Sequence, residues 1–372
     1  MIKIFIITER RADYSRFKPI MELIKKDDQL DYNLVVTGAH LVKSMGYTKN
    51  EILRDGFKIH YEIEMFKPEK DNGASMVRSF ARVADQVTYC LEDSKPNLIL
   101  GGFDIGANLA VTIAGAHMNI PVAHIQGGEV TGTIDESIRH AMTKFSHYHF
   151  TSNIDATERL IKLGELPKNI FNVGCPSIDA IMNTNDDIEI LSRFKLKEND
   201  YFIILQHPVT SEIENSKEQI QITLSAIKKS NINALIILPN NDAGYSNIIK
   251  ELKGSKIQFV ESLKISEYIN LLKRSTGLIG NSSSGIHETS TFNIPTVNIG
   301  SRQSGRLRPE NVLDVNHNEN EICDAIKKCK EIRNNGLEFN NPYGDGKSAK
   351  RIVSIIKSLD LSPAIIQKKI TY

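Results

Sequence analysis

Short apolar runs alternate with longer amphipathic stretches along most of the chain. Residues 2–8, 34–38 and 97–100 are mainly apolar, which is typical of parallel strands buried on both faces. A polar or glycine-containing turn follows each run, and segments such as 15–25 and 75–92 then show the periodicity of helices. This alternation predicts an α/β fold with parallel sheets.

The strand and helix pattern occurs twice, and a polar segment separates the two series. The first series ends near residue 174, residues 183–200 are rich in Asn and Asp, and a new apolar run begins at 201–205. Two such series predict two Rossmann-like domains that face a cleft, over residues 1–180 and 181–347.

Composition narrows the classes of protein that remain. The 372 residues carry 46 basic and 45 acidic side chains, for a net charge of +1, so nothing indicates a nucleic-acid partner. No apolar run approaches the roughly 20 residues of a membrane helix, and the first run is too short for a signal peptide. The four cysteines match no zinc or redox spacing: Cys90, Cys175, Cys323 and Cys329. We therefore expect a cytoplasmic globular protein with reduced thiols, without a membrane partner, metal or cofactor.

Titratable residues are densest just after the apolar run 121–125. Gln126 and two glycines come first, then Glu129, and Asp135 opens a helical segment. Paired glycines permit a tight turn and close approach of a ligand. Ligands bind at the carboxyl ends of parallel strands, and Asp104 ends a neighbouring run in the same register. This corner is therefore a candidate site, although an acidic helix start that only caps itself is the alternative.

Basic residues lie at two further turns between a strand and a helix. Arg11 follows the first strand, and a guanidinium there suits a phosphate or carboxylate, unless it belongs to a solvated basic loop. His207 ends the run 201–205, where it could meet the acidic corner, although a lone histidine is more often structural.

The second half carries a candidate anion site at residues 280–288. Gly280 is followed by Ser282 and Ser283 at the start of a helix, and backbone N–H groups and the helix dipole there favour a phosphate. Glu288 could accept hydrogen bonds from ribose hydroxyls, and Arg302 follows the next strand. The alternative is a serine-rich helix cap.

Five segments together resemble the hydrolysing branch of the UDP-N-acetylglucosamine 2-epimerase family. These segments are residues 11–13, 127–135, 207–210, 281–283 and 301–303. The resemblance covers nearly the whole chain and implies the two-domain GT-B fold, with UDP held mainly by the second domain. It also implies that the C-terminal segment, 348–372, crosses back to the first domain, and that the protein is a homodimer or homotetramer.

The resemblance also implies roles for individual residues. Ser282, Ser283 and Glu288 would hold the diphosphate and ribose, with Arg302 nearby. Asp104, Asp135 and His207 fall on positions that the family uses at the sugar. The complete predicted set adds Glu129 as a catalytic residue and three substrate-binding residues, Arg11, Gln126 and Asn241. In the implied reaction a base, which we expect to be Asp135 or Asp104, removes the C2 proton while UDP leaves C1. Water then adds to the resulting glycal, and His207 would stabilise charge on the phosphate or sugar.

Two departures from the family pattern affect the predicted substrate. The family usually has His-Gly-Asp-Arg where residues 102–105 read Gly-Phe-Asp-Ile, and Glu where Gln126 stands. An amide cannot act as a base, so Gln126 binds substrate or its role passes to Glu129 or Asp135. Phe103 and Ile105 would suit a sugar with fewer hydroxyls if their side chains face it. We therefore predict UDP-N,N'-diacetylbacillosamine as substrate, with UDP-N-acetylglucosamine as the alternative.

Three other functions are compatible with the same motifs. A GT-B glycosyltransferase would use the UDP pocket but need an acceptor, and a non-hydrolysing epimerase would interconvert UDP-sugars without free UDP. A UDP-sugar-binding protein that has lost catalysis is the third, because Gln126 and Ile105 replace charged residues of the family.

Overall fold

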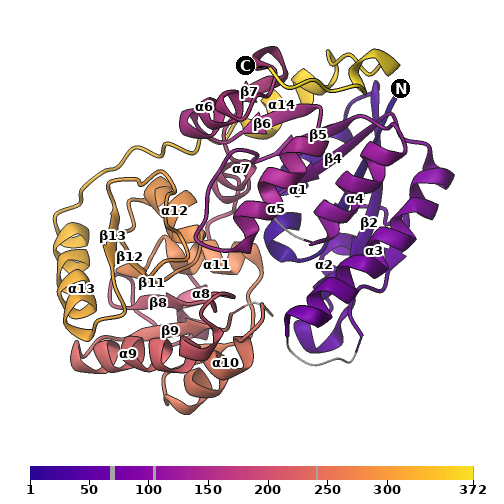
Figure 1. Ribbon diagram of the computed structural model, residues 1–372. Helices are drawn as coiled ribbons and strands as arrows, with labels where there is room; N and C mark the ends of the chain where they lie inside the picture. The colour runs from indigo at the N-terminus through magenta and orange to yellow at the C-terminus, as the bar shows by residue number, and fades with distance from the viewer. Residues whose placement is uncertain (68–71, 104–105, 240–241, 372) are drawn as a thin grey trace. The chain divides into compact units, whose positions relative to one another are not determined.

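The computed structural model describes residues 1–67, 72–103, 106–239 and 242–371. Contacts divide the chain into two compact units. Unit 1 comprises Met1–Glu129, Asp135–Ala180 and Tyr343–Tyr372, and unit 2 comprises Val130–Ile134 and Ile181–Pro342. Each unit contains one parallel sheet with helices packed on it (Figure 1). The predicted α/β fold with two parallel sheets is confirmed.

The sheet of unit 1 has seven strands in the order β3-β2-β1-β4-β5-β6-β7. Its strands are β1 (Ile2–Thr8), β2 (Leu30–Thr37), β3 (Tyr61–Ile63), β4 (Leu98–Gly102), β5 (Val122–Ile125), β6 (Tyr148–Thr151) and β7 (Ile170–Asn172). The helices of the same region are α1 (Arg11–Ile24), α2 (Lys49–Arg54), α3 (Gly73–Ser94), α4 (Gly106–His117), α5 (Ile134–Phe145), α6 (Ile154–Lys162), α7 (Pro176–Met182) and α14 (Ser348–Ile356). The strand order reverses between β1 and β4, and ligands bind beside such a switch point.

Alternate residues of β1 enter two hydrophobic clusters on opposite faces of the sheet. Ile4 and Ile6 pack with Phe17 of α1 and Ile352 of α14. Their neighbours in the strand belong to the other cluster, which includes side chains of α3 and α4. Because both faces are covered, the strand is apolar nearly throughout, as its sequence indicated.

The sheet of unit 2 has six strands in the order β10-β9-β8-β11-β12-β13. Its strands are β8 (Phe202–Leu205), β9 (Ala234–Ile237), β10 (Phe259–Val260), β11 (Gly277–Gly280), β12 (Thr296–Ile299) and β13 (Val312–Val315). Its helices are α8 (Ile190–Arg193), α9 (Ser216–Lys229), α10 (Tyr245–Gly254), α11 (Ile265–Leu272), α12 (Ser284–His287) and α13 (Glu319–Asn334). The central strands β8 and β11 end next to each other, so loops 206–210 and 281–284 are neighbours.

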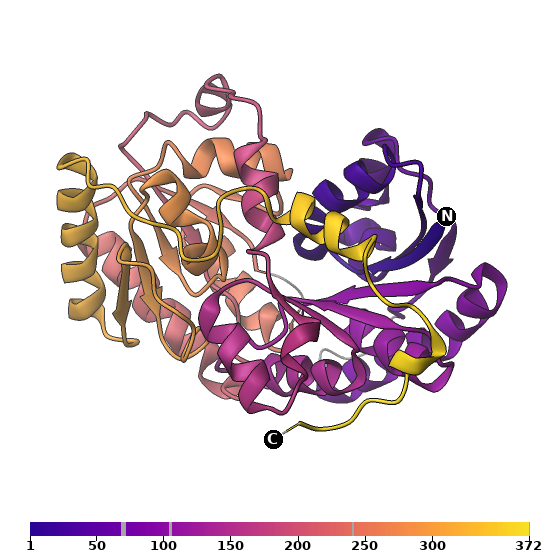
Figure 2. The same cartoon turned by 90° about the horizontal axis from the view of Figure 1, so that it is seen from above.

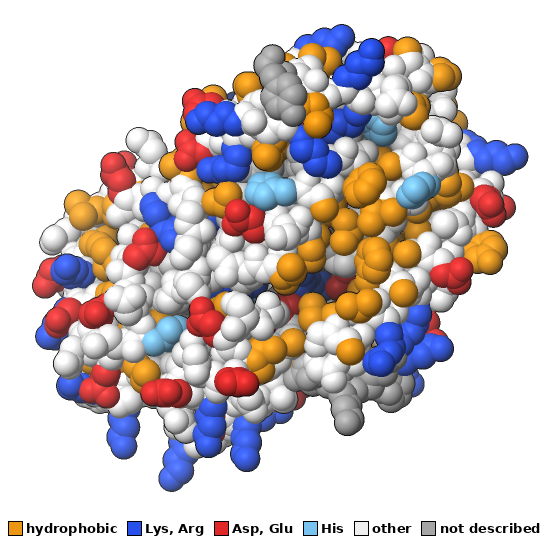
Figure 3. Space-filling model, viewed as in Figure 1, with side chains coloured by type: hydrophobic (Ala, Val, Ile, Leu, Met, Phe, Trp, Pro, Cys, Tyr) orange, Lys and Arg blue, Asp and Glu red, His pale blue; other side chains and the backbone are white. Residues whose placement is uncertain are grey.

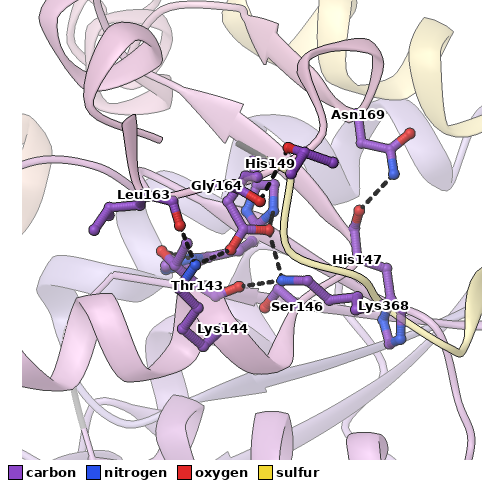
Figure 4. A network of polar contacts seen from close by, with 12 residues as sticks. Thr143, Lys144, Ser146, His147, His149, Leu163, Gly164, Asn169 and Lys368 are labelled. Atoms are coloured by element: carbon purple, nitrogen blue, oxygen red, sulfur yellow. Dashed lines mark hydrogen bonds and ion pairs between the residues drawn. The ribbon is translucent and has the colours of Figure 1, made fainter. Parts of the chain in front are cut away.

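The C-terminal tail is fixed to unit 1 by a buried carboxylate, and Figure 2 shows the tail running along that unit. Glu165 is 2% exposed and accepts hydrogen bonds from His149 Nε2 at 3.1 Å, Lys144 Nζ at 2.9 Å and Lys368 Nζ at 2.6 Å (Figure 4). Lys368 also donates to the carbonyl oxygen of Thr143 at 2.9 Å. Burial opposes ionisation of Glu165, but the hydrogen bonds from His149 and Lys368 lower its pKa to about 2.

A second anchor of the tail fixes the tautomer of His147. The backbone N–H of Val122 donates to His147 Nδ1 at 3.0 Å, so the ring proton is on Nε2, which donates to the carbonyl of Ile366 at 3.3 Å. Farther along, the N–H of Thr371 donates to the carbonyl of Gly164 at 3.0 Å. Residues 366–371 are therefore attached to α5 and to the loops that follow α5 and α6.

Surface charge and thiols agree with the composition. On the face seen in Figure 3, acidic and basic side chains are interspersed. All four cysteines are buried and free, as predicted. Within the part of the chain that the structure describes, no helix combines the length and the hydrophobicity needed to cross a bilayer.

Candidate active site

The turn after β5 holds a buried carboxylate in a fixed position. Glu129 is 4% exposed, and its Oε1 accepts a hydrogen bond from Gln126 Nε2 at 3.0 Å and another from the hydroxyl of Ser152. Gln126 also donates to Cys175 Sγ at 3.3 Å. Its φ of 60° lies in the left-handed region, a costly conformation for such a residue that persists where surrounding contacts enforce it. The amide of Gln126 thus serves to orient Glu129.

The two glycines of this turn are required by packing inside unit 1. Gly128 has a φ of 82°, and a Cβ there would lie 2.4 Å from the carbonyl oxygen of Ala156 in α6. A Cβ on Gly127 would lie 2.9 Å from His124 Nδ1. The close approach that we expected a ligand to make is thus made by the protein itself.

Helix α5 is connected to Glu129 through the side chain of Arg139. Asp135 and Glu136 occupy its first turn, and Arg139, 1% exposed, donates to the carbonyl oxygen of Glu129 at 2.9 Å. His140 lies 3.7 Å from Glu136, and burial together with the charge of Arg139 lowers the pKa of His140. Arg139 thus links helix α5, whose first turn contains Asp135, to the turn that carries Glu129.

Arg11 and a second arginine of α1 have different surroundings. Arg11 forms an ion pair with Glu51 of α2 at 3.0 Å, so its charge is already balanced by a protein carboxylate. The guanidinium of Arg16 lies over the ring of Phe103, 5.0 Å from its centroid. Burial raises the pKa of the Cys175 thiol to about 11, and the positive charge of Arg16 lowers that pKa in part. Arg16 was not among the predicted residues, because its sequence position does not distinguish it from a solvated arginine.

Of residues 102–105, where the sequence departs from the expected family pattern, the structure describes Gly102, which ends β4, and Phe103. Phe103 is 2% exposed and packs edge-on against Phe17, with ring centroids 5.1 Å apart. Its side chain is therefore covered by other residues of unit 1, and the condition that Phe103 faces the sugar is not met. Asp104 and Ile105 lie outside the described residues. Glu9, also missed from sequence, is 8% exposed and accepts a hydrogen bond from the N–H of Ala107 at 3.0 Å at the start of α4.

Asn281 connects the predicted basic residues of unit 2. Its side-chain amide accepts from the N–H of His207 at 2.7 Å and donates to the carbonyl of His207 at 2.9 Å. Its own carbonyl accepts from Arg302 at 3.2 Å and from Gln303 at 2.8 Å. Arg302 also lies 3.9 Å from Asp242. The carboxyl ends of β8, β11 and β12 are thus linked through one residue, by its side chain and its backbone carbonyl. The predicted Asn241 lies outside the described residues.

The serine-rich turn differs in part from the expected anion site. Helix α12 has only four residues, and Ser283 at its start makes no side-chain cap. The N–H of Ser284 donates to Ser282 Oγ at 3.3 Å, and the N–H groups of residues 285–288 are bonded within the turn. So short a helix contributes little dipole, and its N–H groups are used within the turn, so the proposed anion site depends on groups at Ser282 and Ser283 rather than on the helix.

Glu288 is held by side chains that sequence reasoning missed. Ser284 Oγ donates to Glu288 Oε2 at 2.6 Å, and Tyr268 Oη lies 2.5 Å from Ser284 Oγ. All three residues are at most 9% exposed. Ser284 and Glu288 are four residues apart, about one helical turn, so their contact could have been predicted from the sequence. Tyr268 belongs to another helix, α11, and its contact with Ser284 has no such signal in the sequence.

Segment 130–134 groups with unit 2 through the loop after β12. Arg306 Nε donates to the carbonyl of Val130 at 3.0 Å, and the N–H of Gly132 donates to the carbonyl of Arg302 at 3.1 Å. A Cβ on Gly132 would lie 2.0 Å from the carbonyl oxygen of Ser301. Gly132, the second glycine of residues 128–132 (Gly-Glu-Val-Thr-Gly), is therefore needed for this backbone contact.

Comparison with known proteins gives consistent results. The family model for UDP-N-acetylglucosamine 2-epimerase matches residues 22–357. The chain is 34% identical to a hydrolysing UDP-N,N'-diacetylbacillosamine 2-epimerase of Legionella pneumophila, with 98% of each chain covered. It is 29% identical to a UDP-N-acetylglucosamine 2-epimerase of Neisseria meningitidis, covering 99% and 98%. A crystal structure of the Neisseria meningitidis UDP-GlcNAc 2-epimerase bound to UDP-GlcNAc has the same fold, with a TM-score of 0.83 at 20% identity over 96% of this chain and 100% of that one.

Proposed function

Because this chain belongs to the UDP-N-acetylglucosamine 2-epimerase family, we propose that it is a hydrolysing UDP-sugar 2-epimerase that acts on UDP-N,N'-diacetylbacillosamine. The products are UDP and 2,4-diacetamido-2,4,6-trideoxymannose, a precursor in the biosynthesis of nonulosonic acids such as legionaminic acid. The observation that carries this proposal is Glu129, a buried carboxylate held by two hydrogen-bond donors beside the end of β5.

The first chemical step needs a base beside a weakly acidic C–H bond. A carboxylate removes the proton from C2 of the sugar while the bond between C1 and the UDP oxygen breaks on the opposite face. The electrons of the C–H bond form the C1=C2 double bond of a glycal, and UDP takes the electrons of the broken bond. Asp104, Glu129 and Asp135 are the candidate bases, and such catalysis typically contributes about 10²–10⁴-fold to the rate.

Hydration of the glycal completes the reaction. The hydroxyl of water joins C1, and a proton joins C2 on the face opposite the one that lost it. The free sugar is therefore inverted at C2, and one water is consumed for each UDP released. This stereochemistry requires groups on both faces of the sugar ring, so we assign at least two of the candidate carboxylates to proton transfer.

Negative charge develops on the UDP diphosphate as it leaves. We assign Ser282 and Ser283 to this diphosphate and Glu288 to the ribose. We assign Arg302 and His207 to stabilising this charge. The guanidinium of Arg302 is oriented by its hydrogen bond to the Asn281 carbonyl, and Asn281 fixes the backbone of His207. Preorganised donors of this kind are the usual source of large rate enhancements.

The choice of sugar rests on two observations. The Legionella relative, 34% identical, is named for the diacetylated sugar, and Ile105 replaces an arginine of the family pattern. The second candidate substrate is UDP-N-acetylglucosamine, which would give N-acetylmannosamine and UDP; the meningococcal relative, 29% identical, favours it.

Turnover of both nucleotide sugars by the purified protein tests the choice. We expect kcat/KM, measured from UDP release, to be at least about tenfold higher for UDP-N,N'-diacetylbacillosamine, as one or two altered substituents in a pocket can discriminate to that degree. The opposite preference would overturn it. UDP release that needs an added acceptor would identify a glycosyltransferase, and binding without turnover would identify an inactive binder.

A further inference from the structure

Tyr268, Ser284 and Glu288 form a chain of side-chain hydrogen bonds inside unit 2. The Tyr268 hydroxyl, from α11, lies 2.5 Å from Ser284 Oγ at the start of α12. Ser284 Oγ lies 2.6 Å from Glu288 Oε2, at the end of the same helical turn. The three side chains belong to residues that are 9%, 8% and 8% exposed, so water does little to weaken these bonds.

The direction of the bonds follows from counting protons. A serine hydroxyl has one proton, and Ser284 donates it to the carboxylate of Glu288. The bond between Tyr268 and Ser284 must then use the proton of the tyrosine. Burial and the negative charge of Glu288 raise the pKa of Tyr268, which keeps that proton in place. The order is therefore Tyr268 to Ser284 to Glu288, with every proton directed toward the carboxylate.

We propose that Tyr268 and Ser284 are positioning residues, which orient the Glu288 carboxylate so that it accepts hydrogen bonds from the ribose hydroxyls of a uridine nucleotide. This inference rests on the proposed function, since it takes the ligand to be UDP. A glutamate has three rotatable side-chain bonds, and an ionised carboxylate in a buried site needs hydrogen bonds. Anchoring Oε2 through Ser284 fixes the plane of the carboxylate before ligand arrives, which reduces the entropy lost on binding.

The hydrogen bonds from Tyr268 through Ser284 to Glu288 should control selectivity for the ribose. Removing the Tyr268 hydroxyl leaves Ser284 with no donor on that side and loosens its hold on Glu288. Affinity for UDP should then fall more than affinity for 2'-deoxy-UDP, which lacks one of the hydroxyls that Glu288 receives. A residue that only supported packing would affect both nucleotides equally, so the ratio of their dissociation constants separates the two roles.

The test measures dissociation constants of UDP and 2'-deoxy-UDP by calorimetry for the wild type, Tyr268→Phe, Ser284→Ala and Glu288→Gln. We expect the wild type to prefer UDP by about tenfold or more, the usual size of a hydrogen bond to a charged group. The preference should fall at least about threefold in Tyr268→Phe and Ser284→Ala, which is the usual size of a hydrogen bond between neutral groups. The double variant Tyr268→Phe, Glu288→Gln should lose no more preference than Glu288→Gln alone.

Tyr201→Phe is the matched control, because the Tyr201 hydroxyl is also buried in unit 2 but donates to the carbonyl of Leu271. Its preference for UDP should equal that of the wild type, and thermal unfolding shows that each variant is folded. An unchanged preference in Tyr268→Phe and Ser284→Ala would overturn the inference, as would a wild type that binds both nucleotides equally. A wild type that binds neither nucleotide would refute the proposed function itself.

Discussion

The side-chain nitrogen of Gln126 lies 3.0 Å from Oε1 of Glu129 and donates a hydrogen bond to it. An amide cannot remove a proton from a sugar, but it can orient and stabilise a neighbouring carboxylate. We propose that Gln126, which stands where the family resemblance predicts a glutamate, orients Glu129 and leaves that carboxylate available as a base.

Glu129→Gln should reduce turnover strongly while UDP binding persists. We expect kcat to fall by at least about 10²-fold, as for loss of a general base, with UDP affinity close to that of the wild type. UDP release and calorimetry measure the two quantities. Glu136→Gln, the same change in the neighbouring first turn of α5, should remain active. Wild-type turnover in Glu129→Gln would instead assign the base role to Asp104 or Asp135.

Gln126→Glu should impair the protein at neutral pH. Two carboxylates at hydrogen-bond distance cannot both be ionised cheaply, so they would share a proton. We expect a loss of stability of about 1–3 kcal/mol and a pH–rate profile displaced from that of the wild type. Gln126→Gly tolerates the left-handed backbone but removes the amide, and should lower activity without displacing the profile. An unchanged profile in Gln126→Glu would contradict this view of the pair.

Lys368→Met should destabilise unit 1 because it removes one donor from the buried Glu165. The lysine is partly exposed, so we expect the free energy of unfolding to fall by about 1–2 kcal/mol, less than for a fully buried pair. Urea denaturation measures the change. Lys369→Met is the control, because Lys369 follows Lys368 directly and its side chain is exposed. This variant should leave the free energy of unfolding unchanged. Equal stabilities of the two variants would show that the tail contact contributes nothing.

Acid should weaken the anchor of the tail. The pKa of Glu165 is about 2 in the folded protein, against an ordinary value of 4.5. The unfolded chain therefore takes up a proton first as pH falls, and the stability that Glu165 contributes above pH 4.5 is lost progressively toward pH 2. Burial also lowers the pKa of His149 from 6.5, which adds a loss of stability in the same direction below pH 6.5.

The difference in unfolding free energy between the wild type and Glu165→Gln isolates the contribution of the carboxylate. The variant should be less stable at pH 7, and the difference should shrink as pH falls below 4.5. Urea midpoints at pH 7, 5 and 4 provide the comparison. A difference that is constant over this range would contradict the lowered pKa of Glu165.

Much of the fold and the family could be predicted from the sequence. Apolar runs reveal strands buried on both faces, and motifs at the ends of these runs identified the family, as the comparisons confirm. Glu129 and Asp135 lie in one motif, so their common corner was also predictable. Asp104 and Asn241 lie outside the described residues, and the roles assigned to the predicted site residues remain predictions.

Contacts between distant segments could not be predicted. Cys175 meets Gln126 across 49 residues of sequence, and Tyr268 reaches Ser284 only because α11 packs beside α12. The sequence pattern also did not indicate that α12 ends after four residues, with a 3₁₀ turn, Thr289–Phe292, following after one intervening residue. Such features depend on packing between elements, whereas periodicity reports only the elements themselves.

Incubation of the purified protein with UDP-N,N'-diacetylbacillosamine in D₂O, followed by proton NMR, tests the central claim most directly. We predict free UDP in equal amount to a sugar of manno configuration that carries deuterium at C2, because the proton at that carbon is exchanged with solvent during elimination and hydration. Release of UDP with the C2 proton retained, or a new UDP-sugar without free UDP, would contradict the account.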